Sequence, residues 1–368
     1  MSLSRTARSV IRALRHRGPL RLGMQALRVL ATEGPMGITR RMAAHHQPAL
    51  PLTDPGADPR ACAVVTTPHV AHVAQMMADV LGEHGYRAQI AHDTRGTEGF
   101  AHVFVLCPQM FAAVPPHYVA FQMEQSVSSR WFTPDYLARL AAARAVLDYS
   151  AGNIAFLRDR GLALDRLFHV PLDTDPNRPL SGAARQGALF YGDPTSPRRR
   201  RMLADLKARI PELQVESTLF GPDLTERLDR AAVVLNIHYH DGALLETTRI
   251  NQALSHGVQV VSEGGADADR HADLAGVVDF APMGDIGTLV QLVRRALDDP
   301  EHAAARHKAA AAHARRADNR FRAGFRRFLL AQDMIPQADF DAAVPGWGGP
   351  VPTRPHLCLT LPETPGRQ

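Results

Sequence analysis

One stretch, residues 233–263, constrains the fold of this chain more than any other; it reads VVLNIHYHDGALLETTRINQALSHGVQVVSE. Two apolar runs flank a helical stretch that a glycine ends, in the order Val233–Ile237, Leu244–His256 and Val258–Val261. Short apolar, β-branched runs predict buried strands, and a glycine just past the last periodic residue is typical of a helix end. Such a strand, helix and strand form a right-handed crossover between parallel strands. The chain is therefore expected to build a parallel α/β sheet.

Polar residues gather at the ends of these two predicted strands. Four of them follow or end the strands: His238, His240, Asp241 and Glu263. Ligands of parallel sheets bind at the carboxyl ends of the strands. On the helix between them, Glu246, Arg249 and Gln252 recur at three-residue spacing and so share one face. This face is either a solvated surface or part of a ligand site, and the spacing alone leaves both readings open.

The segment Gln252–Val261, QALSHGVQVV, resembles the donor-binding segment of two-domain glycosyltransferases of the GT-B architecture. Many of these enzymes have a helix reading E-A-L-x-x-G and a strand reading V-P-V-V. Gln252 stands where they usually have Glu, and Gln259 where they usually have Pro. The resemblance implies an α/β fold of two Rossmann-like domains facing a central cleft. It also implies that residue 252 holds the ribose of a nucleotide-sugar, with Glu246 sharing this role.

A second polar segment, residues 121–132, reads FQMEQSVSSRWF. It resembles bacterial polysaccharide-type glycosyltransferases that read Q-x-E-Q followed by S-S-R-W. Glu124 is a candidate general base, or a group that orients an acceptor hydroxyl, and Trp131 is a candidate for stacking on a sugar. A helix start and a core aromatic are the alternatives. His69, after the first strand, stands where some inverting GT-B enzymes have their base. The candidate catalytic residues are Glu124, His69 and Glu246.

The second half of the chain contains a predicted helix start at Ser196-Pro197, after the predicted strand Ala188–Tyr191. Backbone amides at a helix start and arginine side chains bind phosphate groups. Four arginines in a row cannot all point the same way, so some of them are solvated. The residues expected to bind the nucleotide-sugar are Gly192, Arg198, Arg199, Glu246, Thr247, Thr248, Arg249 and Gln252.

Alternating strand and helix patterns over 368 residues predict two α/β domains. The predicted organisation is a basic helical lead-in and linker (1–60), an acceptor domain (61–175), a nucleotide-sugar domain (176–335) and a Pro/Gly-rich tail (336–368). The Ala/Arg-rich helical region over residues 301–327 is expected to cross back onto the first domain, as in many GT-B enzymes. No apolar run approaches the roughly 18–20 residues that span a bilayer, and no secretory signal is evident.

The positive charge of the chain belongs to its first segment. Residues 1–46 contain nine arginines and one acidic residue, a net charge of +8, which leaves −3 for the rest of a chain whose total is +5. The remainder therefore lacks the basic surface of a nucleic-acid-binding protein. Apolar residues among the arginines predict helices that lie on an anionic membrane surface or dock on the protein. Three dispersed cysteines are typical of a cytoplasmic protein. The basic first segment adds the expectation of peripheral association with the inner face of the membrane.

The sequence contains no Walker lysine loop, nucleophile elbow or dinucleotide fingerprint, which leaves the NTPase, hydrolase and dehydrogenase readings without their defining motifs. His238-x-His240-Asp241 is a candidate metal site, but a third or fourth ligand is not evident. No metal or cofactor is expected, and the nucleotide-sugar is a substrate. The leading hypothesis is a metal-independent, hexosyltransferase-like enzyme of surface polysaccharide or glycoconjugate synthesis, acting on a glycan or lipid-linked acceptor. The alternative is a non-catalytic GT-B-like module that binds a sugar or a partner.

Overall fold

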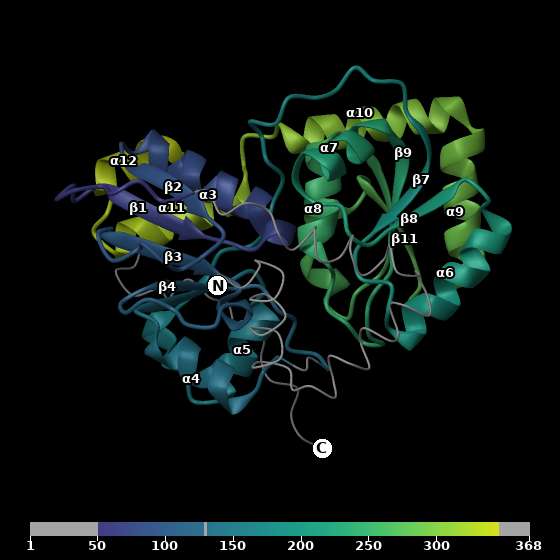
Figure 1. The fold of residues 1–368 in the computed structure, drawn as a ribbon. Coiled ribbons are helices and arrows are strands. Elements are labelled where there is room, and N and C mark those ends of the chain that lie inside the picture. Colours follow the sequence, from purple (N-terminus) through teal and green to yellow (C-terminus); the bar gives the residue numbers. More distant parts are fainter. Residues whose placement is uncertain (1–50, 129–130, 346–368) are drawn as a thin grey trace, which may run out of the picture. The chain divides into compact units, whose positions relative to one another are not determined.

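The computed structural model describes residues 51–128 and 131–345 (Figure 1). The predicted basic helices of residues 1–46 and the predicted strand at residues 356–363 lie outside these ranges. Cys62 and Cys107 are buried free thiols. Within the described ranges, no helix combines the length and the apolar character needed to cross a bilayer.

The first half of the chain forms a parallel sheet of six strands. They are β1 Ala61–Val65, β2 Arg87–Ala91, β3 His102–Leu106, β4 Val119–Gln122, β5 Ala145–Asp148 and β6 Leu167–His169. Their hydrogen-bonded order is β2-β1-β3-β4-β5-β6. The direction of winding reverses between β1 and β3, which is the doubly wound pattern. Most of these strands are buried apolar runs, as expected of a sheet covered on both faces.

The second half forms a parallel sheet of five strands with the same winding. They are β7 Gln186–Tyr191, β8 Leu213–Glu216, β9 Ala231–Asn236, β10 Gln259–Glu263 and β11 Val278–Ala281. Their order is β11-β10-β9-β7-β8, so the winding reverses between β7 and β9. The strand, helix and strand predicted within residues 233–263 are confirmed as β9, a helix at Thr247–Ser255 and β10.

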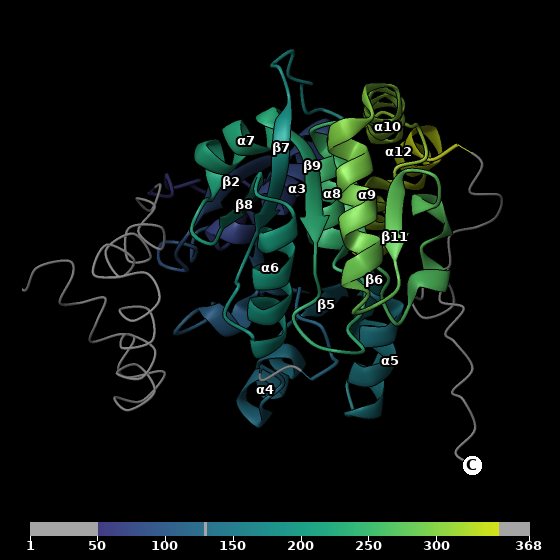
Figure 2. The ribbon, with the colours of Figure 1, turned by 90° about the vertical axis from the view of Figure 1, so that its right-hand side faces the viewer.

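Helices cover both faces of each sheet. They are α3 Ala71–Glu83, α4 Pro134–Ala142, α5 Ala151–Asp159, α6 Pro197–Arg209, α7 Gly221–Arg230, α8 Thr247–Ser255, α9 Ile286–Asp298, α10 Pro300–Ala314, α11 Arg320–Ala331 and α12 Gln337–Ala343. Figure 2 shows α6 and α9 beside each other over the second sheet, where their apolar residues share one core cluster. Apolar residues of α7, α8 and α10 belong to the cluster on the other face.

One strand boundary predicted from the sequence was wrong. Residues 214–220 were predicted to form one strand, but β8 ends at Glu216 and α7 begins at Gly221-Pro222. The helical region predicted over residues 301–327 comprises two helices, because the chain leaves the helical path after Ala314 and Asn319 caps a new start. The tail also contains α12. The predicted start of α6 is confirmed, since the Ser196 hydroxyl accepts a hydrogen bond from the amide of Arg199.

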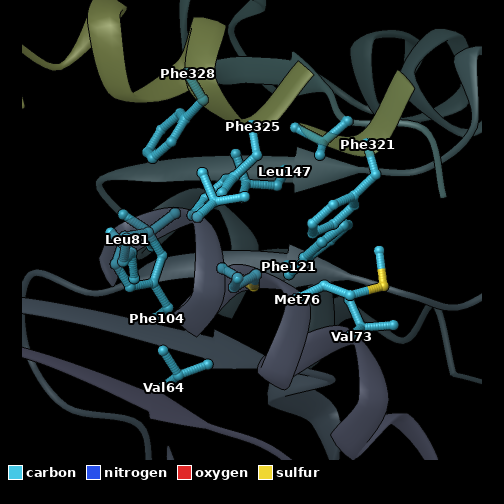
Figure 3. Close-up of a cluster of buried hydrophobic side chains, with 14 of the residues drawn as sticks. Val64, Val73, Met76, Leu81, Phe104, Phe121, Leu147, Phe321, Phe325 and Phe328 are labelled. Carbon is cyan, nitrogen blue, oxygen red and sulfur yellow. The ribbon is translucent and has the colours of Figure 1, made fainter. Parts of the chain in front are cut away.

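Helix α11 packs on the first sheet, far from its neighbours in sequence (Figure 3). Three fully buried phenylalanines of α11, Phe321, Phe325 and Phe328, lie against β3, β4 and β5 and helix α3. The rings of Phe104 and Phe325 lie 5.8 Å apart. The last described helices therefore complete the core of the first half, as the tail was expected to do. The predicted domain bounds at residues 60, 175 and 335 stay predictions.

Candidate functional site

The reversal of winding in the second sheet lies between β7 and β9, and ligands of doubly wound sheets bind at such a point. The segment after β7 begins with Gly192, and the segment after β9 contains His238. Helix α8 starts at Thr247 and presents its amino terminus, which carries partial positive charge, at the same edge. The sequence-predicted donor residues belong to these three segments.

Glu246, the residue before α8, lies between two arginines. Its Oε1 is 2.5 Å from Nη2 of Arg199, and its Oε2 is 2.6 Å from Nη1 of Arg249. The three side chains are 14%, 3% and 12% exposed, so the ion pairs are shielded from solvent. Burial raises the pKa of Glu246, but the two guanidinium groups outweigh it and hold the pKa well below its usual range. Glu246 is therefore ionised at neutral pH.

Arg199 ties together the segments that follow β7 and β9. Its Nη1 donates to the carbonyl of Asp193 at 2.9 Å, and its Nε donates to the carbonyl of Ile237 at 2.8 Å. Its guanidinium also lies 5.2 Å from the centre of the Tyr239 ring. Because Nη2 is taken by Glu246, all three guanidinium nitrogens have protein partners. Arg199 thus anchors the site and supplies charge to it.

Arg198 makes a separate buried ion pair. Its Nη1 and Nη2 bind the two carboxylate oxygens of Glu263 at 2.8 and 2.6 Å, and its Nε lies 2.5 Å from Asp241. Glu263 is fully buried and also accepts hydrogen bonds from the amides of His238 and Gly284. The pair therefore joins the ends of β9 and β10. The next two arginines, at positions 200 and 201, are exposed, so the prediction that the four would point in different directions is confirmed.

Arg249 has a guanidinium nitrogen available to a ligand. Its Nη1 binds Oδ1 of Asn236 at 2.6 Å as well as Glu246. No acceptor in the described part of the chain binds its Nη2. Gly192 lies directly over this nitrogen, since a Cβ at residue 192 would come within 2.5 Å of it. A side chain at residue 192 would therefore clash with the guanidinium of Arg249 in its present position.

The other predicted donor residues lie around this group. The Oε1 of Gln252 accepts a hydrogen bond from the Tyr191 hydroxyl at 3.2 Å. Thr247 is 4% exposed, and its Oγ1 has no hydrogen-bond partner among the residues with described positions. Thr248, next to it, is half-buried. The structure thus brings together the residues that the spacing grouped on one helix face, and their roles toward a donor stay predictions.

His238 and its neighbours do not form a metal site in the described residues, where no group of three or more His, Cys, Asp or Glu side chains could hold an ion. His238 is fully buried, and its Nε2 lies 3.2 Å from the carbonyl of Glu263. Its Nδ1 is 3.8 Å from Oε1 of Glu246. The buried imidazole therefore lies close to the carboxylate of Glu246.

A second polar group lies at the carboxyl ends of β1, β3 and β4 in the first sheet. Nδ1 of His69 is 3.0 Å from the Thr67 hydroxyl, and Nε2 of His69 is 3.9 Å from Sγ of Cys107. The amide of Gln109 donates to Oε1 of Glu124 at 3.0 Å. The two predicted catalytic residues of this half, His69 and Glu124, thus lie at neighbouring strand ends.

Cys107 and Gln109 were missed from the sequence. Cys107 adopts a left-handed backbone conformation, with φ of 53°, which is uncommon for a residue other than glycine and concentrates at functional sites. Burial raises the pKa of its thiol, so the thiol is neutral rather than a nucleophilic thiolate. The one available signal was the polar Cys-Pro-Gln that follows a buried strand.

Two doubly wound parallel sheets follow one another in this chain, and a carboxy-terminal helix returns to the first of them. This is the GT-B architecture. The predicted fold class is therefore confirmed in its two Rossmann-like halves, while the central cleft stays a prediction.

Comparison with known proteins found no matching family model and no matching curated protein. Solved structures similar to this GT-B chain include HepE from Anabaena in complex with UDP-glucose, with 11% identity, a TM-score of 0.48 and coverage of 69% of this chain and 93% of that one. Sucrose-phosphate synthase from Thermosynechococcus elongatus has 12% identity, a TM-score of 0.49 and coverage of 74% and 98%. WaaG, a glycosyltransferase involved in lipopolysaccharide biosynthesis, has 12% identity, a TM-score of 0.48 and coverage of 78% and 100%. These similarities concern the fold.

The ion pairs of Glu246 predict a pH-dependent effect of Glu246→Gln. The substitution should cost about 3–5 kcal/mol of unfolding free energy at pH 7, because it leaves buried guanidinium groups without their counter-charge. A carboxyl whose pKa is lowered by folding stabilises the protein above its unfolded-state pKa, and this stabilisation declines as the pH falls below that value toward the folded-state pKa. The difference between wild type and variant should therefore be full at pH 6–7 and shrink below about pH 4.5. Urea unfolding at pH 7 and pH 3.5 measures it, and a difference independent of pH would contradict the assignment.

Proposed function

We propose that this protein transfers a sugar from a nucleotide-sugar donor to a hydroxyl group of a glycan or lipid-linked acceptor. The second sheet binds the donor, and the first sheet binds the acceptor. One observation carries the proposal: Nη2 of Arg249 lies under Gly192 at the reversal of winding, next to the amino terminus of α8. An arginine beside the positive end of a helix is a suitable site for a diphosphate.

The charge of the site supports an anionic ligand. Arg199 and Arg249 carry two positive charges, and Glu246, which lies between them, carries one negative charge. The neighbouring Arg198 is paired separately, with the buried carboxylate of Glu263 and the exposed carboxylate of Asp241. The partly buried group around Glu246 thus has one excess positive charge, which a phosphate group would neutralise.

The same arrangement suits the chemistry of glycosyl transfer. When the bond between sugar and phosphate breaks, negative charge grows on the departing diphosphate. Arg249, held in place by Asn236 and Glu246, would stabilise this charge without having to reorganise. Because protein cations and the positive end of α8 would supply this stabilisation, we propose that transfer is metal-independent. In the first sheet, Glu124 or His69 would accept the proton of the acceptor hydroxyl or orient that hydroxyl.

We also propose a cellular location, on the basis of the positive charge of the first segment. The nine arginines of residues 1–46 would bring the enzyme to an anionic membrane surface, where lipid-linked acceptors are found. This corresponds to a cytoplasmic enzyme at the inner face of the membrane, in surface polysaccharide or glycoconjugate synthesis. Partition of the full chain between buffer and vesicles containing phosphatidylserine measures the association.

One observation favours the alternative of a non-catalytic binding module. Gln252 occupies the position of the usual ribose-binding acid, and its Oε1 is already bound by the Tyr191 hydroxyl. A module of this kind would bind a nucleotide diphosphate without releasing sugar. Incubation with a panel of nucleotide-sugars separates the two functions, because the enzyme releases nucleotide diphosphate and the module does not.

Arg249→Gln should weaken binding of UDP or GDP, whichever the wild type binds, about 10- to 100-fold, the cost of one charge-assisted hydrogen bond. Isothermal titration calorimetry measures the change. Arg200→Gln is the matched control, since Arg200 is an exposed arginine on α6 that makes no contact in the site. Its affinity should equal that of the wild type. Equal affinities for all three proteins would overturn the role of Arg249, and a wild type that binds neither nucleotide would overturn the proposed function.

Gly192→Ala should impair binding through the same guanidinium. Its φ is 128°, and the new methyl group would lie 2.5 Å from Nη2 of Arg249. We expect a loss of about 1–3 kcal/mol of stability from backbone strain and a larger Kd for the nucleotide, because the guanidinium must move. Gly182→Ala is the control, since no atom lies within 4 Å of a Cβ at residue 182. Unchanged affinity in a folded Gly192→Ala protein would show that the ligand approaches elsewhere.

A further inference from the structure

Asp148, the last residue of β5, is a fully buried carboxyl group surrounded by hydrogen-bond donors. Its Oδ2 accepts from Nε2 of Gln122 at 2.8 Å. Its Oδ1 accepts from the amide of Ser150 at 2.8 Å and from Nδ2 of Asn153 at 3.1 Å. In the part of the chain that the structure describes, no Lys or Arg pairs with it. Asp148 therefore binds the NH2 groups of two side-chain amides, one from β4 and one from α5.

The same two side-chain amides hold the backbone that follows β4. Nε2 of Gln122 and Nδ2 of Asn153 each donate to the carbonyl of Glu124 at 2.8 Å. The oxygen of Gln122 accepts from the amide of Glu124 at 2.5 Å, and the oxygen of Asn153 accepts from the amide of Ser126 at 2.9 Å. We call residues 123–126 the clamped loop. Four hydrogen bonds from two side chains thus fix its backbone.

The orientation of both side-chain amides depends on Asp148. A carboxamide has an NH2 group on one side and an oxygen on the other, so its oxygen can accept from the loop amides only if its NH2 group is turned toward acceptors. The two oxygens of Asp148 accept all three of its hydrogen bonds, and they therefore hold the NH2 groups of Gln122 and Asn153 toward Asp148. Their oxygens are then directed at the amides of the clamped loop.

The clamped loop connects residues of both proposed substrate sites. It carries Glu124, whose carboxylate belongs to the polar group of the first sheet. Its Gln125 donates from Nε2 to the carbonyl of Leu244 at 2.9 Å, two residues before Glu246. A change in the path of this loop would therefore move the acceptor-side carboxylate and release a contact with the donor-side segment.

We propose that Asp148 is a positioning residue, which orients Gln122 and Asn153 so that they hold the clamped loop and place Glu124 toward the acceptor hydroxyl. The part of this inference that concerns the acceptor rests on the proposed function. The hydrogen bonds that fix the loop are a property of the fold and are tested separately.

The energetic cost of Asp148 supports a role beyond stability. Burial raises the pKa of Asp148 to about 8, in opposition to its hydrogen bonds, which lower it. The neighbouring titratable groups are Glu124, Tyr136 and Tyr149, and burial raises the pKa of both tyrosines, which leaves them neutral. A buried carboxyl without a cation costs stability, and strongly shifted groups of this kind concentrate at functional sites.

Asp148→Asn in the full chain tests the proposal. Asn presents an NH2 group in place of one carboxylate oxygen, so it cannot bind both neighbouring amides as Asp does. Hydrogen–deuterium exchange of the Glu124 and Ser126 amides should accelerate at least about tenfold. The kcat of transfer should fall about 10- to 100-fold through misplacement of Glu124, while the Kd for UDP or GDP stays at the wild-type value.

Tyr118→Phe is the control for a general loss of stability. It removes one buried hydrogen bond of the same half, from the hydroxyl to the carbonyl of Arg139 at 2.7 Å, and leaves the clamped loop untouched. Its exchange in the loop and its kcat should match the wild type. If Asp148→Asn does not fold, Asn153→Ala removes two of the four loop hydrogen bonds and keeps Asp148, with the same expected results.

Exchange at Glu124 and Ser126 that equals the wild type in a folded variant would overturn the proposal. Accelerated exchange with unchanged kcat would overturn the positioning of Glu124. Failure of the proposed function gives a different result, because the wild-type protein would then release no nucleotide diphosphate from any nucleotide-sugar. In that case the exchange experiment still tests whether Asp148 orients the loop.

Discussion

The second half of this protein depends on a buried carboxylate held between two arginines. Glu246 neutralises part of the charge of Arg199 and Arg249, and without it two guanidinium groups would lie unpaired beside a helix terminus that is itself positive. Arg199 in turn binds the carbonyls of the segments after β7 and β9. The loops of the site, its charge and the orientation of Arg249 all follow from this arrangement.

The architecture was predictable because local patterns and global fold agree in this chain. Apolar runs of about five residues that alternate with helical stretches predict a parallel sheet covered on both faces. Ser196 and Pro197 mark the start of α6 by local chemistry alone. The sequence did not show those element boundaries that tertiary contacts determine. Residues 315–319 interrupt an Ala/Arg-rich stretch because α11 must turn to pack its phenylalanines on the first sheet.

The candidate site was predictable in position and only partly in detail. Three-residue spacing places Glu246, Arg249 and Gln252 on one face, and a strand end places Gly192 beside them. Spacing does not reveal which carboxylate pairs with which arginine. Arg198 lies 65 positions before Glu263, and only the order of the strands brings them together. For the same reason the sequence does not show that Asp148 orients two side chains of neighbouring elements.

The central claim is that the carboxyl ends of β7 and β9, with the start of α8, bind a nucleotide diphosphate. Hydrogen–deuterium exchange of the wild-type protein, with and without saturating UDP or GDP, tests it most directly. The account predicts slower exchange at residues 192–196 and at the first-turn amides of α8, residues 247–249, with little change at the edge strand β2. Binding that protects neither segment, or protection confined to the first sheet, would contradict it.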